Sequence, residues 1–470
     1  MRMFGGLDLF SDRTALLSSD GKSISYEHLL KQATSLSRQL PGRRLVLVVA
    51  SNNPKFVTGY VGFLRAGMAQ LIVGEAIAPE FLAKIISIYS PEYAFFPKSM
   101  AEKPMKGELK YEDQDYQLIK LADSKFCKLH PDLALLLSTS GTTGSPKMVR
   151  ISFQNLHTNT ESILGYLEIQ STDRTITTMP LSYSYGLSIL NTHLTAGASI
   201  VMTDASVVSR EFWNILRDKS VTSLGGVPYF FEMLRKLKFE KMDLPLLHTI
   251  TQAGGKLGAA LAREFTDICL NKKIRFYIMY GQTEATARMS YLCATDHPSK
   301  SESIGQAIPG GKLWLQDEAG ERVTTAGVAG ELVYYGANVS MGYAENQVDL
   351  ASGDLNGGIL RTGDLATCDQ DGFYTIVGRK NRFLKVFGLR VNLFELEEVL
   401  RGKNYECACA GTDQKLIIYL TNIDAQAKIE SLVFELTGIH KNGFEVVKID
   451  AIPRTASGKI NYKALDDLRE

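Results

Sequence analysis

The chain has 470 residues, more than one ordinary hydrophobic core accommodates, so two or more domains are expected. Hydrophobic residues make up 45 % of it, as in globular proteins, and 52 Lys and Arg residues nearly balance 51 Asp and Glu residues. This balance excludes a general electrostatic attraction to nucleic acid or to an anionic membrane. The sequence also lacks an apolar run long enough to span a membrane.

The start of the chain and the cysteines indicate a cytoplasmic protein. Asp8 and Asp12 lie near the start, where no signal-like apolar stretch is found. The six cysteines are dispersed, and their spacing matches neither a disulfide scaffold nor a zinc site. Cys407 and Cys409 alternate along a predicted strand, which places both in the core. A reducing cytoplasm is therefore the expected environment.

Predicted strands and helices alternate through about the first 280 residues. Apolar, β-branched runs predict strands over residues 44–50, 70–73, 133–137, 198–202, 221–224, 247–251 and 274–279. Apolar residues with helical spacing predict helices over residues 54–64, 212–216, 229–237 and 259–270. Such alternation is typical of βαβ units that build mostly parallel sheets.

The pattern changes after residue 300. Short strands with glycine turns are predicted over 310–315, 330–335 and 372–377, which indicates a β-rich subdomain. Farther on, Asn392 and Glu395 form a variant of the capping box. The C-terminal elements are then expected to be a helix at about 392–401, strands at about 415–420 and 444–449, and a helix at about 425–437.

The expected fold is therefore α/β with two domains. A large N-terminal domain, residues 1–378, holds mostly parallel sheets flanked by helices together with the β-rich subdomain. Residues 379–382 form a hinge, and residues 383–470 form a small, mobile α+β domain.

The segment Ser138-Thr-Ser-Gly-Thr-Thr-Gly-Ser-Pro-Lys147 follows a predicted buried strand. Its hydroxyls, backbone N–H groups and ammonium suit a polyanion, and its glycines let the backbone approach closely. The spacing differs from the Walker loop, in which Gly-Lys is followed by Ser or Thr. The loop resembles the nucleotide-binding signature of the acyl-activating, AMP-forming superfamily, which includes acyl-CoA synthetases, peptide-synthetase adenylation domains and firefly luciferase. The resemblance implies that ATP is bound by Thr139, Ser140, Gly141, Thr142, Thr143, Gly144 and Lys147.

Two further segments carry the same resemblance. In Tyr280-Gly-Gln-Thr-Glu284 it implies that Tyr280 stacks on adenine, Thr283 contacts the α-phosphate and Glu284 helps to hold Mg²⁺. A carboxylate beside phosphates needs such a cation, because the two anions repel each other. Ala253-Gly-Gly-Lys256 resembles the turn that faces adenine and the acyl group, which assigns nucleotide binding to Gly254 and Gly255.

Three charged residues complete the family pattern. Asp364, in Arg361-Thr-Gly-Asp364, is expected to accept hydrogen bonds from both ribose hydroxyls, as an ionised carboxylate can. Arg379 matches a family arginine that also reaches the ribose. Lys459, at the end of Pro453-Arg-Thr-Ala-Ser-Gly-Lys459, matches the mobile lysine that bridges the attacking carboxylate and the nucleotide. The residues implied in catalysis are thus Lys459, Thr283 and Glu284.

The segment Lys385-Val-Phe-Gly-Leu-Arg390 matches the family loop that turns toward the pantetheine tunnel when the small domain rotates. This match assigns Lys385 and Gly388 to the thiol substrate. Two positions depart from the family pattern, since the hinge residue is Asn381 rather than Asp and Leu393 replaces a usual Pro. Asn tolerates the left-handed conformation of a hinge but carries no charge.

The acyl group is expected to lie against Tyr183, Gly225, Gly226 and Val227, although Tyr183 and Val227 could equally be packing residues. Amino-acid-activating relatives carry an Asp near Tyr183 that pairs with the α-ammonium of the substrate. None is present between Met179 and Leu194. Burying an unpaired ammonium costs on the order of several kcal/mol, so an acid without an α-amino group is favoured.

The resemblance implies ATP- and Mg²⁺-dependent activation of a carboxylic acid through an acyl adenylate, followed by transfer to the thiol of CoA, as in acyl-CoA synthetases. Three alternatives stay open at this stage. They are an acyl-AMP ligase that loads the phosphopantetheine of an acyl carrier protein, a catalytically silent nucleotide- or acyl-binding module, and oxidation of the adenylate as in luciferase. The residues leave the acyl group, the acceptor and the oligomeric state open.

Overall fold

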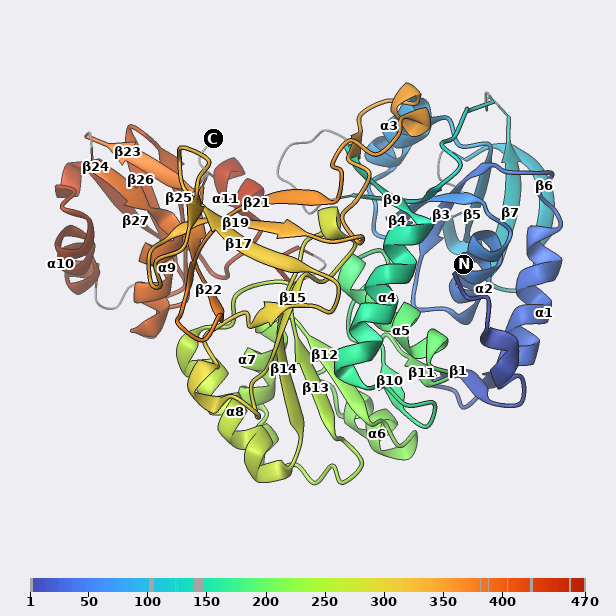
Figure 1. The fold of residues 1–470 in the computed structure, drawn as a ribbon, viewed down its shortest axis with the longest axis horizontal. Coiled ribbons are helices and arrows are strands. Elements are labelled where there is room, and N and C mark those ends of the chain that lie inside the picture. Colours follow the sequence, from blue (N-terminus) through green and yellow to red (C-terminus); the bar gives the residue numbers. More distant parts are fainter. Residues whose placement is uncertain are drawn as a thin grey trace.

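The computed structural model describes residues 3–100, 105–122, 124, 126–138, 147–380, 382–387, 389–403, 405–422, 426–455 and 458–468. Figure 1 shows two large sheets with helices between and around them, a smaller sheet beside them, and a C-terminal lobe that contains α9, α10 and α11. The expected α/β fold class is confirmed.

The first large sheet has nine strands and is parallel in its centre. Its order is β16 (Gln306–Ala307), β15 (Ser290–Cys293), β14 (Arg275–Tyr280), β13 (Thr249–Gln252), β12 (Ser223–Gly226), β10 (Arg174–Ile176), β11 (Ser199–Met202), β1 (Thr14–Ser18) and β2 (Ser23–Ser25). The strands from β14 to β1 are parallel, whereas β2, β15 and β16 are antiparallel to their neighbours. Parallel neighbours need crossovers, which are supplied here by α6 (Arg210–Asp218), α7 (Pro228–Lys236) and α8 (Ala259–Lys272).

The second large sheet has eight strands. Its order is β20 (Tyr343–Ala344), β9 (Met148–Ser152), β8 (Leu133–Ser138), β4 (Ala69–Gly74), β3 (Leu45–Ala50), β5 (Tyr93–Pro97), β7 (Tyr116–Leu121) and β6 (Gly107–Glu112). Its four central strands, β8, β4, β3 and β5, are parallel, and its outer strands are antiparallel. Helices α2 (Pro54–Arg65) and α3 (Pro79–Tyr89) provide its crossovers.

The two large sheets share one hydrophobic core. Besides α2, the helices α1 (Tyr26–Ser37), α4 (Phe153–Leu167) and α5 (Ser184–Thr195) contribute to it. The core joins Val48 of the eight-stranded sheet to Ile200 of the nine-stranded sheet through Phe56 of α2 and Leu190 of α5. Helix α2 is buried continuously from Phe56 to Leu64, as expected of a helix that is apolar on all sides. The strands whose ends carry the loops of both sheets are thus anchored in one packed core.

The remaining elements form a five-stranded sheet and the C-terminal lobe. The sheet has the order β18 (Arg322–Val323), β17 (Lys312–Gln316), β19 (Gly330–Tyr335), β21 (Ile359–Cys368) and β22 (Tyr374–Arg379). The lobe contains β23 (Phe383–Val386), β24 (Leu389–Asn392), α9 (Leu393–Gly402), β25 (Cys407–Thr412), β26 (Lys415–Leu420), α10 (Gln426–Thr437), β27 (Phe444–Lys448) and α11 (Tyr462–Asp467). It has a separate buried cluster, which includes Leu400 and Ile418.

Most predicted elements are present, with shifts that have local causes. Strand β12 begins at Ser223 rather than Val221, because the chain leaving α6 turns at Ser220 with φ 54°. Strand β22 continues to Arg379, so the first residue of the predicted hinge lies in a sheet, while Asn381 lies outside the described residues. Asn392 caps α9 by accepting from the backbone N–H groups of Phe394 and Glu395. Cys407 and Cys409 are buried on β25, as predicted.

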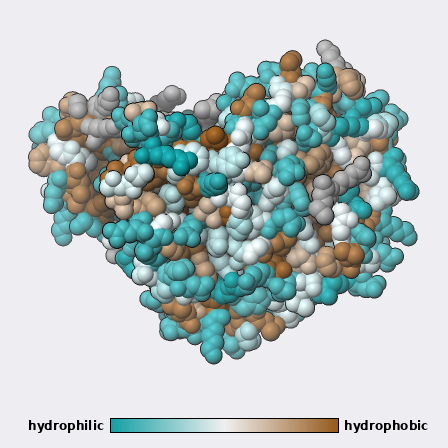
Figure 2. Space-filling view, viewed as in Figure 1, coloured by the Kyte–Doolittle hydropathy of each residue, from teal (hydrophilic) through white to brown (hydrophobic). Residues whose placement is uncertain are grey.

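No helix within the described ranges is both long and apolar enough to cross a membrane. On the face shown in Figure 2, hydrophobic residues are scattered in small groups among hydrophilic ones.

Candidate active site

Asp364 is the centre of a buried polar cluster made by three separate strands. Tyr280 ends β14, and the register of β21 and β22 places Asp364 opposite Arg379. Tyr280 Oη donates to Asp364 Oδ2 at 2.5 Å, Gln282 Nε2 donates to the same oxygen at 3.0 Å, and Arg379 Nε donates to Oδ1 at 2.8 Å. Asp364 is only 2 % exposed. The structure thus brings together the residues that are predicted to contact adenine and ribose.

The donors around Asp364 offset the free-energy cost of burying its charge. Hydrogen bonds to charged groups stabilise by about 1.5–3 kcal/mol each, and three are present. The carboxylate in turn raises the pKa of Arg379, and burial together with Asp364 raises the pKa of Tyr280. Gln282 had no predicted role, although its place between Tyr280 and Thr283 in the motif is the signal that could have identified it.

Thr283 and Glu284 form the 3₁₀ turn Thr283–Ala285 directly after the cluster. The hydroxyls of Thr283 and Ser184 are 3.2 Å apart, so Thr283 faces the start of α5. Tyr343 Oη donates to Glu284 Oε1 at 2.7 Å, and burial followed by the Glu284 charge raises the pKa of Tyr343. Sequence reasoning did not identify Tyr343, which comes from β20, 59 residues farther along the chain.

Glu284 is the carboxylate in this cluster that could hold Mg²⁺. Among the described residues, no group of three or more His, Cys, Asp or Glu side chains is arranged to bind a metal ion. Mg²⁺ usually takes one or two protein carboxylates and fills its octahedron with water and phosphate oxygens, so a single carboxylate such as Glu284 has the chemistry that it needs.

Lys147 and Glu284 both contact the side chain of Tyr343. The Lys147 Nζ is 3.2 Å from Glu345 Oε1 and 4.0 Å from the centre of the Tyr343 ring. Tyr343 therefore contacts both the lysine that ends the phosphate loop and the carboxylate predicted to hold the metal. The rest of the predicted loop lies outside the described residues, namely Thr139, Ser140, Gly141, Thr142, Thr143 and Gly144.

Lys459 reaches the same region from the C-terminal lobe. Its turn is closed by a hydrogen bond from Thr455 N to Lys459 O at 2.8 Å and by the left-handed Gly458, whose φ is 78°. The Lys459 Nζ lies 5.2 Å from the centre of the Tyr183 ring. Burial and the nearby Arg379 charge lower the pKa of Lys459, while Glu284 and Asp364 act in the opposite direction. The predicted catalytic lysine and the predicted nucleotide site thus face each other.

The glycines of the predicted acyl site are packed closely by neighbouring side chains. A Cβ at Gly225 would lie 2.8 Å from Ile189, and one at Gly226 would overlap the Phe230 side chain. Gly254 has φ 85°, and a Cβ there would lie 2.8 Å from Tyr183 Oη and 3.0 Å from Val227. A Cβ at Gly255 would likewise lie 3.2 Å from the Pro228 ring. These glycines permit the close approach of neighbouring side chains.

The C-terminal lobe touches the large domain through a few charged contacts. Lys256 Nζ is 3.3 Å from Glu398, and Arg454 is 3.7 Å from Glu232 and stacks over Tyr229 at 4.7 Å. Ion pairs that retain solvent contact contribute about 0–1 kcal/mol each. These ion pairs therefore add little to holding the lobe in this position, where Phe394 of α9 also packs against the core of the five-stranded sheet.

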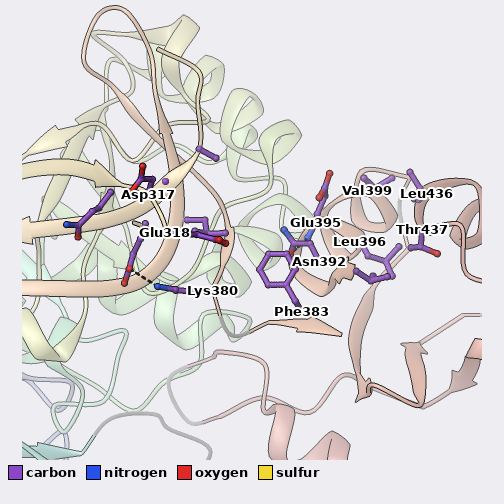
Figure 3. A pocket seen from close by; sticks show the side chains of 16 residues that line it. Asp317, Glu318, Lys380, Phe383, Asn392, Glu395, Leu396, Val399, Leu436 and Thr437 are labelled. Atoms are coloured by element: carbon purple, nitrogen blue, oxygen red, sulfur yellow. Dashed lines mark hydrogen bonds and ion pairs between the residues drawn. The ribbon is translucent and has the colours of Figure 1, made fainter. Parts of the chain in front are cut away.

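A cavity of about 580 Å³ separates the lobe from the five-stranded sheet. Figure 3 shows Asp317, Glu318 and Lys380 on one side of it and Phe383, Asn392, Glu395, Leu396, Val399, Leu436 and Thr437 on the other. Lys380 pairs with Glu331 at 3.1 Å across its wall. None of the predicted catalytic or nucleotide-binding residues that the structure describes lines this cavity, so it is set apart from the candidate site.

The hairpin predicted to meet the thiol substrate lies elsewhere. Lys385 of β23 pairs in register with Arg390 of β24, and Gly388 lies outside the described residues. Figure 1 shows β23 and β24 at the outer edge of the lobe, away from β12, β13 and β14. The structure thus brings Lys459, and not this hairpin, to the cluster around Asp364.

The chain is similar to known proteins in sequence and in fold. A sequence profile of the AMP-binding enzyme family matches residues 7–344. The chain is 26 % identical over 479 residues to one of the proteins that make up the linear gramicidin synthase of Brevibacillus parabrevis, covering 97 % of the chain but 6 % of that protein. It is 28 % identical over 350 residues to indoleacetate–CoA ligase of Aromatoleum aromaticum, covering 72 % of the chain and 66 % of the ligase. It is 25 % identical over 406 residues to D-alanine–D-alanyl carrier protein ligase of Staphylococcus haemolyticus, covering 84 % and 80 %.

Solved structures show the same fold. O-succinylbenzoate coenzyme A synthetase from Bacillus subtilis, in complex with ATP and a magnesium ion, matches with a TM-score of 0.75 at 19 % identity, covering 98 % of each chain. The chain spans only a small part of the gramicidin synthase protein, so the full activity of that relative does not carry over to it. The family profile, in contrast, covers well over half of the chain. This chain belongs to the AMP-binding enzyme family.

Proposed function

We propose that the protein activates a carboxylic acid with ATP through an acyl adenylate and then transfers the acyl group to the thiol of CoA. The observation that carries this proposal is the position of Lys459, which lies over the Tyr183 ring and close enough to Arg379, Glu284 and Asp364 for their charges to act on it. A nucleotide-recognition cluster and a mobile cation are the two parts that adenylation needs, and family membership supports their assignment.

In the first half-reaction, an oxygen of the substrate carboxylate attacks the α-phosphorus of ATP, and the bond to pyrophosphate breaks. The Asp364 oxygens retain lone pairs that can accept from the ribose hydroxyls. Lys459 places a positive charge where negative charge develops on the α-phosphate, and Lys147 lies at the end of the loop proposed to hold the departing pyrophosphate. Mg²⁺, held by Glu284 and phosphate oxygens, would neutralise the phosphates.

In the second half-reaction, the thiol sulfur attacks the acyl carbon, AMP leaves and the thiol proton passes to solvent. We infer a rotation of residues 383–470 about residues 379–382, which removes Lys459 and brings in the hairpin that carries Lys385 and Gly388. The gap beside Lys380 and the weak contacts at Lys256 and Arg454 support such a movement. Rotation of a domain can then limit turnover.

A carrier protein is the second candidate acceptor. Similarity to a D-alanine–D-alanyl carrier protein ligase over 84 % of the chain favours it, because such an enzyme loads a carrier protein. A catalytically silent module is disfavoured, because Lys147, Glu284, Asp364 and Lys459 are all present.

The test is pyrophosphate release across a panel of aliphatic, aromatic and amino acids, with ATP and Mg²⁺. Each acid is tested alone, with hydroxylamine as a trap, with CoA, and with a carrier protein that bears phosphopantetheine. We expect acid-dependent pyrophosphate and hydroxamate, and a thioester with CoA. A thioester on the carrier protein alone would favour the second candidate, and no pyrophosphate with any acid would contradict the proposed activation.

A further inference from the structure

Arg288 is a buried cation close to the candidate active site. It lies between the 3₁₀ turn Thr283–Ala285 and strand β15, and it is 2 % exposed. Its guanidinium stacks over the Tyr185 ring at 5.0 Å. A buried charge costs several kcal/mol unless it is paired, so its partners decide whether its role is structural.

The guanidinium of Arg288 is poorly satisfied by the protein. Within the described part of the chain, its only hydrogen-bond contacts join Nη1 to Tyr166 Oη at 3.3 Å and to Met279 Sδ at 3.1 Å. The Nε atom of Arg288 is buried without an acceptor, and no carboxylate of the described residues forms a salt bridge with this guanidinium. A thioether and a hydroxyl are weak partners for a cation that has five N–H donors.

Arg150 is a buried arginine of the same protein whose donors are paired with backbone carbonyls. It is 0 % exposed, and its guanidinium donates to four backbone carbonyls at 2.6–3.1 Å, those of Met341, Tyr343, Ser352 and Gly353. The contrast indicates that Arg288 is kept for an acceptor other than the surrounding protein.

The only carboxylate that shares the cavity with Arg288, among the residues described, is already engaged. Asp173 accepts from His248 Nε2 at 3.0 Å and from the Gln170 backbone N–H at 2.8 Å. His193, which also lines this cavity, is buried, and burial lowers its pKa to about 4, so it is neutral near pH 7. The described wall of the cavity thus leaves the positive charge of Arg288 without a paired anion.

The cavity lies on the acyl side of the candidate site. Gly225 and Thr251 line it together with Arg288, and Tyr185 Oη is 2.8 Å from Thr251 Oγ1. The Tyr183 and Tyr185 rings contact each other with centres 6.4 Å apart. Lys459 lies over the first ring and Arg288 over the second. An acid that extends along the two rings would have one end at each cation.

We propose that Arg288 recognises a second carboxylate of the acid that the enzyme activates, so that the substrate is a short dicarboxylic acid. This inference rests on the proposed function, since it assigns one carboxyl group to Lys459 and the other to Arg288. A guanidinium fork matches a carboxylate with two parallel hydrogen bonds. The cavity has a volume of about 20 Å³, room for about one water, so binding of a carboxylate at Arg288 requires a movement of the Tyr185 ring that covers the guanidinium.

The kinetic test compares dicarboxylic acids with monocarboxylic acids of the same length, such as succinate with butyrate and phthalate with benzoate. In the wild type we expect the dicarboxylic acid of at least one pair to be preferred. Arg288→Met should raise the KM for that dicarboxylic acid on the order of 10- to 100-fold, as expected for the loss of a charged hydrogen bond. The KM for each monocarboxylic acid should stay within about threefold of the wild-type value. Arg288→Lys should restore part of the preference.

Arg263→Met is the matched control, because Arg263 is a surface arginine whose side chain is 59 % exposed. It should change the KM of neither the dicarboxylic nor the monocarboxylic acids. A preference for monocarboxylic acids in every pair, or an equal loss for both classes in Arg288→Met, would overturn the proposal.

Thermal unfolding separates this inference from the proposed function, because it needs no turnover. Replacing an unpaired buried charge by an apolar side chain is often neutral or stabilising, so Arg288→Met should keep or raise the Tm without ligand. The preferred dicarboxylic acid, at saturating concentration, should raise the Tm of the wild type and of Arg263→Met but not of Arg288→Met. A fall in the Tm of unliganded Arg288→Met would mark a structural arginine. Equal stabilisation of all three proteins would mean that the acid binds elsewhere, and either result contradicts the inference.

Discussion

The ammonium of Lys459 lies 5.2 Å from the centre of the Tyr183 ring, although the two residues are 276 positions apart. The approach is close at the backbone as well, since a Cβ at Gly458 would lie 2.7 Å from the Val227 side chain. The C-terminal lobe therefore occupies the arrangement in which its lysine faces the residues proposed to bind the acyl group and the nucleotide, as the proposed adenylation step needs.

Lys459→Ala should reduce acid-dependent pyrophosphate release by about 10²- to 10³-fold, because it removes the charge that stabilises the transition state at the α-phosphate. The variant should still transfer the acyl group from a supplied acyl adenylate to the thiol, since Lys459 is proposed to leave before that step. Rapid-quench measurement of both half-reactions checks this. Lys463→Ala, on the exposed face of α11, is the control. Adenylate formation at a rate near that of the wild type would refute the assigned role.

The pH dependence of adenylation should show an alkaline limb below the ordinary lysine pKa of 10.5. Burial and the Arg379 charge lower the pKa of Lys459, and the ammonium form is the active one. Activity should therefore be present at pH values below this lowered pKa and be lost as pH rises through it. The profile of kcat/KM for ATP reports the free enzyme and is the quantity to measure. In Lys459→Arg, any residual activity should lack this limb, and an unchanged limb would assign it to another group.

Asp364→Asn should raise the KM for ATP by about 10- to 100-fold, because an amide has one acceptor oxygen in place of two, carries no charge and places an N–H₂ against its neighbouring donors. The donors that would lose an acceptor are Tyr280, Gln282 and Arg379. ATP titration of pyrophosphate release measures the effect. Asp371→Asn, at a side chain that is 67 % exposed, is the control. If both variants keep the KM of the wild type, Asp364 does not bind the nucleotide.

His193 should make the fold sensitive to acid. Burial lowers its pKa from 6.5 to about 4, so between these values the unfolded chain binds a proton that the folded chain does not. The free energy of unfolding should therefore fall as pH decreases from 6.5 to 4, by up to about 3 kcal/mol from this residue. Urea unfolding at several pH values should show a weaker fall in His193→Gln, while the partly exposed His157→Gln should follow the wild type. Parallel curves for all three proteins would contradict this assignment.

Amino acids should be poor substrates. Among the described residues that line the cavity beside the proposed acyl site, Asp173 is the only carboxylate, and it is already paired with His248, so none is free for an α-ammonium. Hydroxamate formation compares each α-amino acid with the corresponding acid that lacks the amino group. More hydroxamate with the amino acid than with its counterpart would contradict this prediction, because it would show that the site pairs an ammonium.

Local patterns along the chain were sufficient for the elements and for the residue types of the site. Strand β4 extends one residue to either side of the predicted range 70–73, and α8 begins at the predicted Ala259. The motif residues Tyr280, Asp364, Arg379 and Lys459 all lie in one region, as the family resemblance implied. Local pattern was insufficient where a turn set the strand boundary, as at β12 after the left-handed Ser220.

By itself, the sequence determined the fold class, the family and the set of polar residues, because hydrophobic periodicity and short motifs depend on neighbours along the chain. Only the tertiary structure decided which groups meet. It brought Tyr343 to Glu284, Gln282 to Asp364 and Lys459 to Tyr183. It also left Arg288 buried beside Tyr185 without a described carboxylate partner. Whether a buried charge is paired depends on strands and helices that are distant in sequence, so no local pattern can report it.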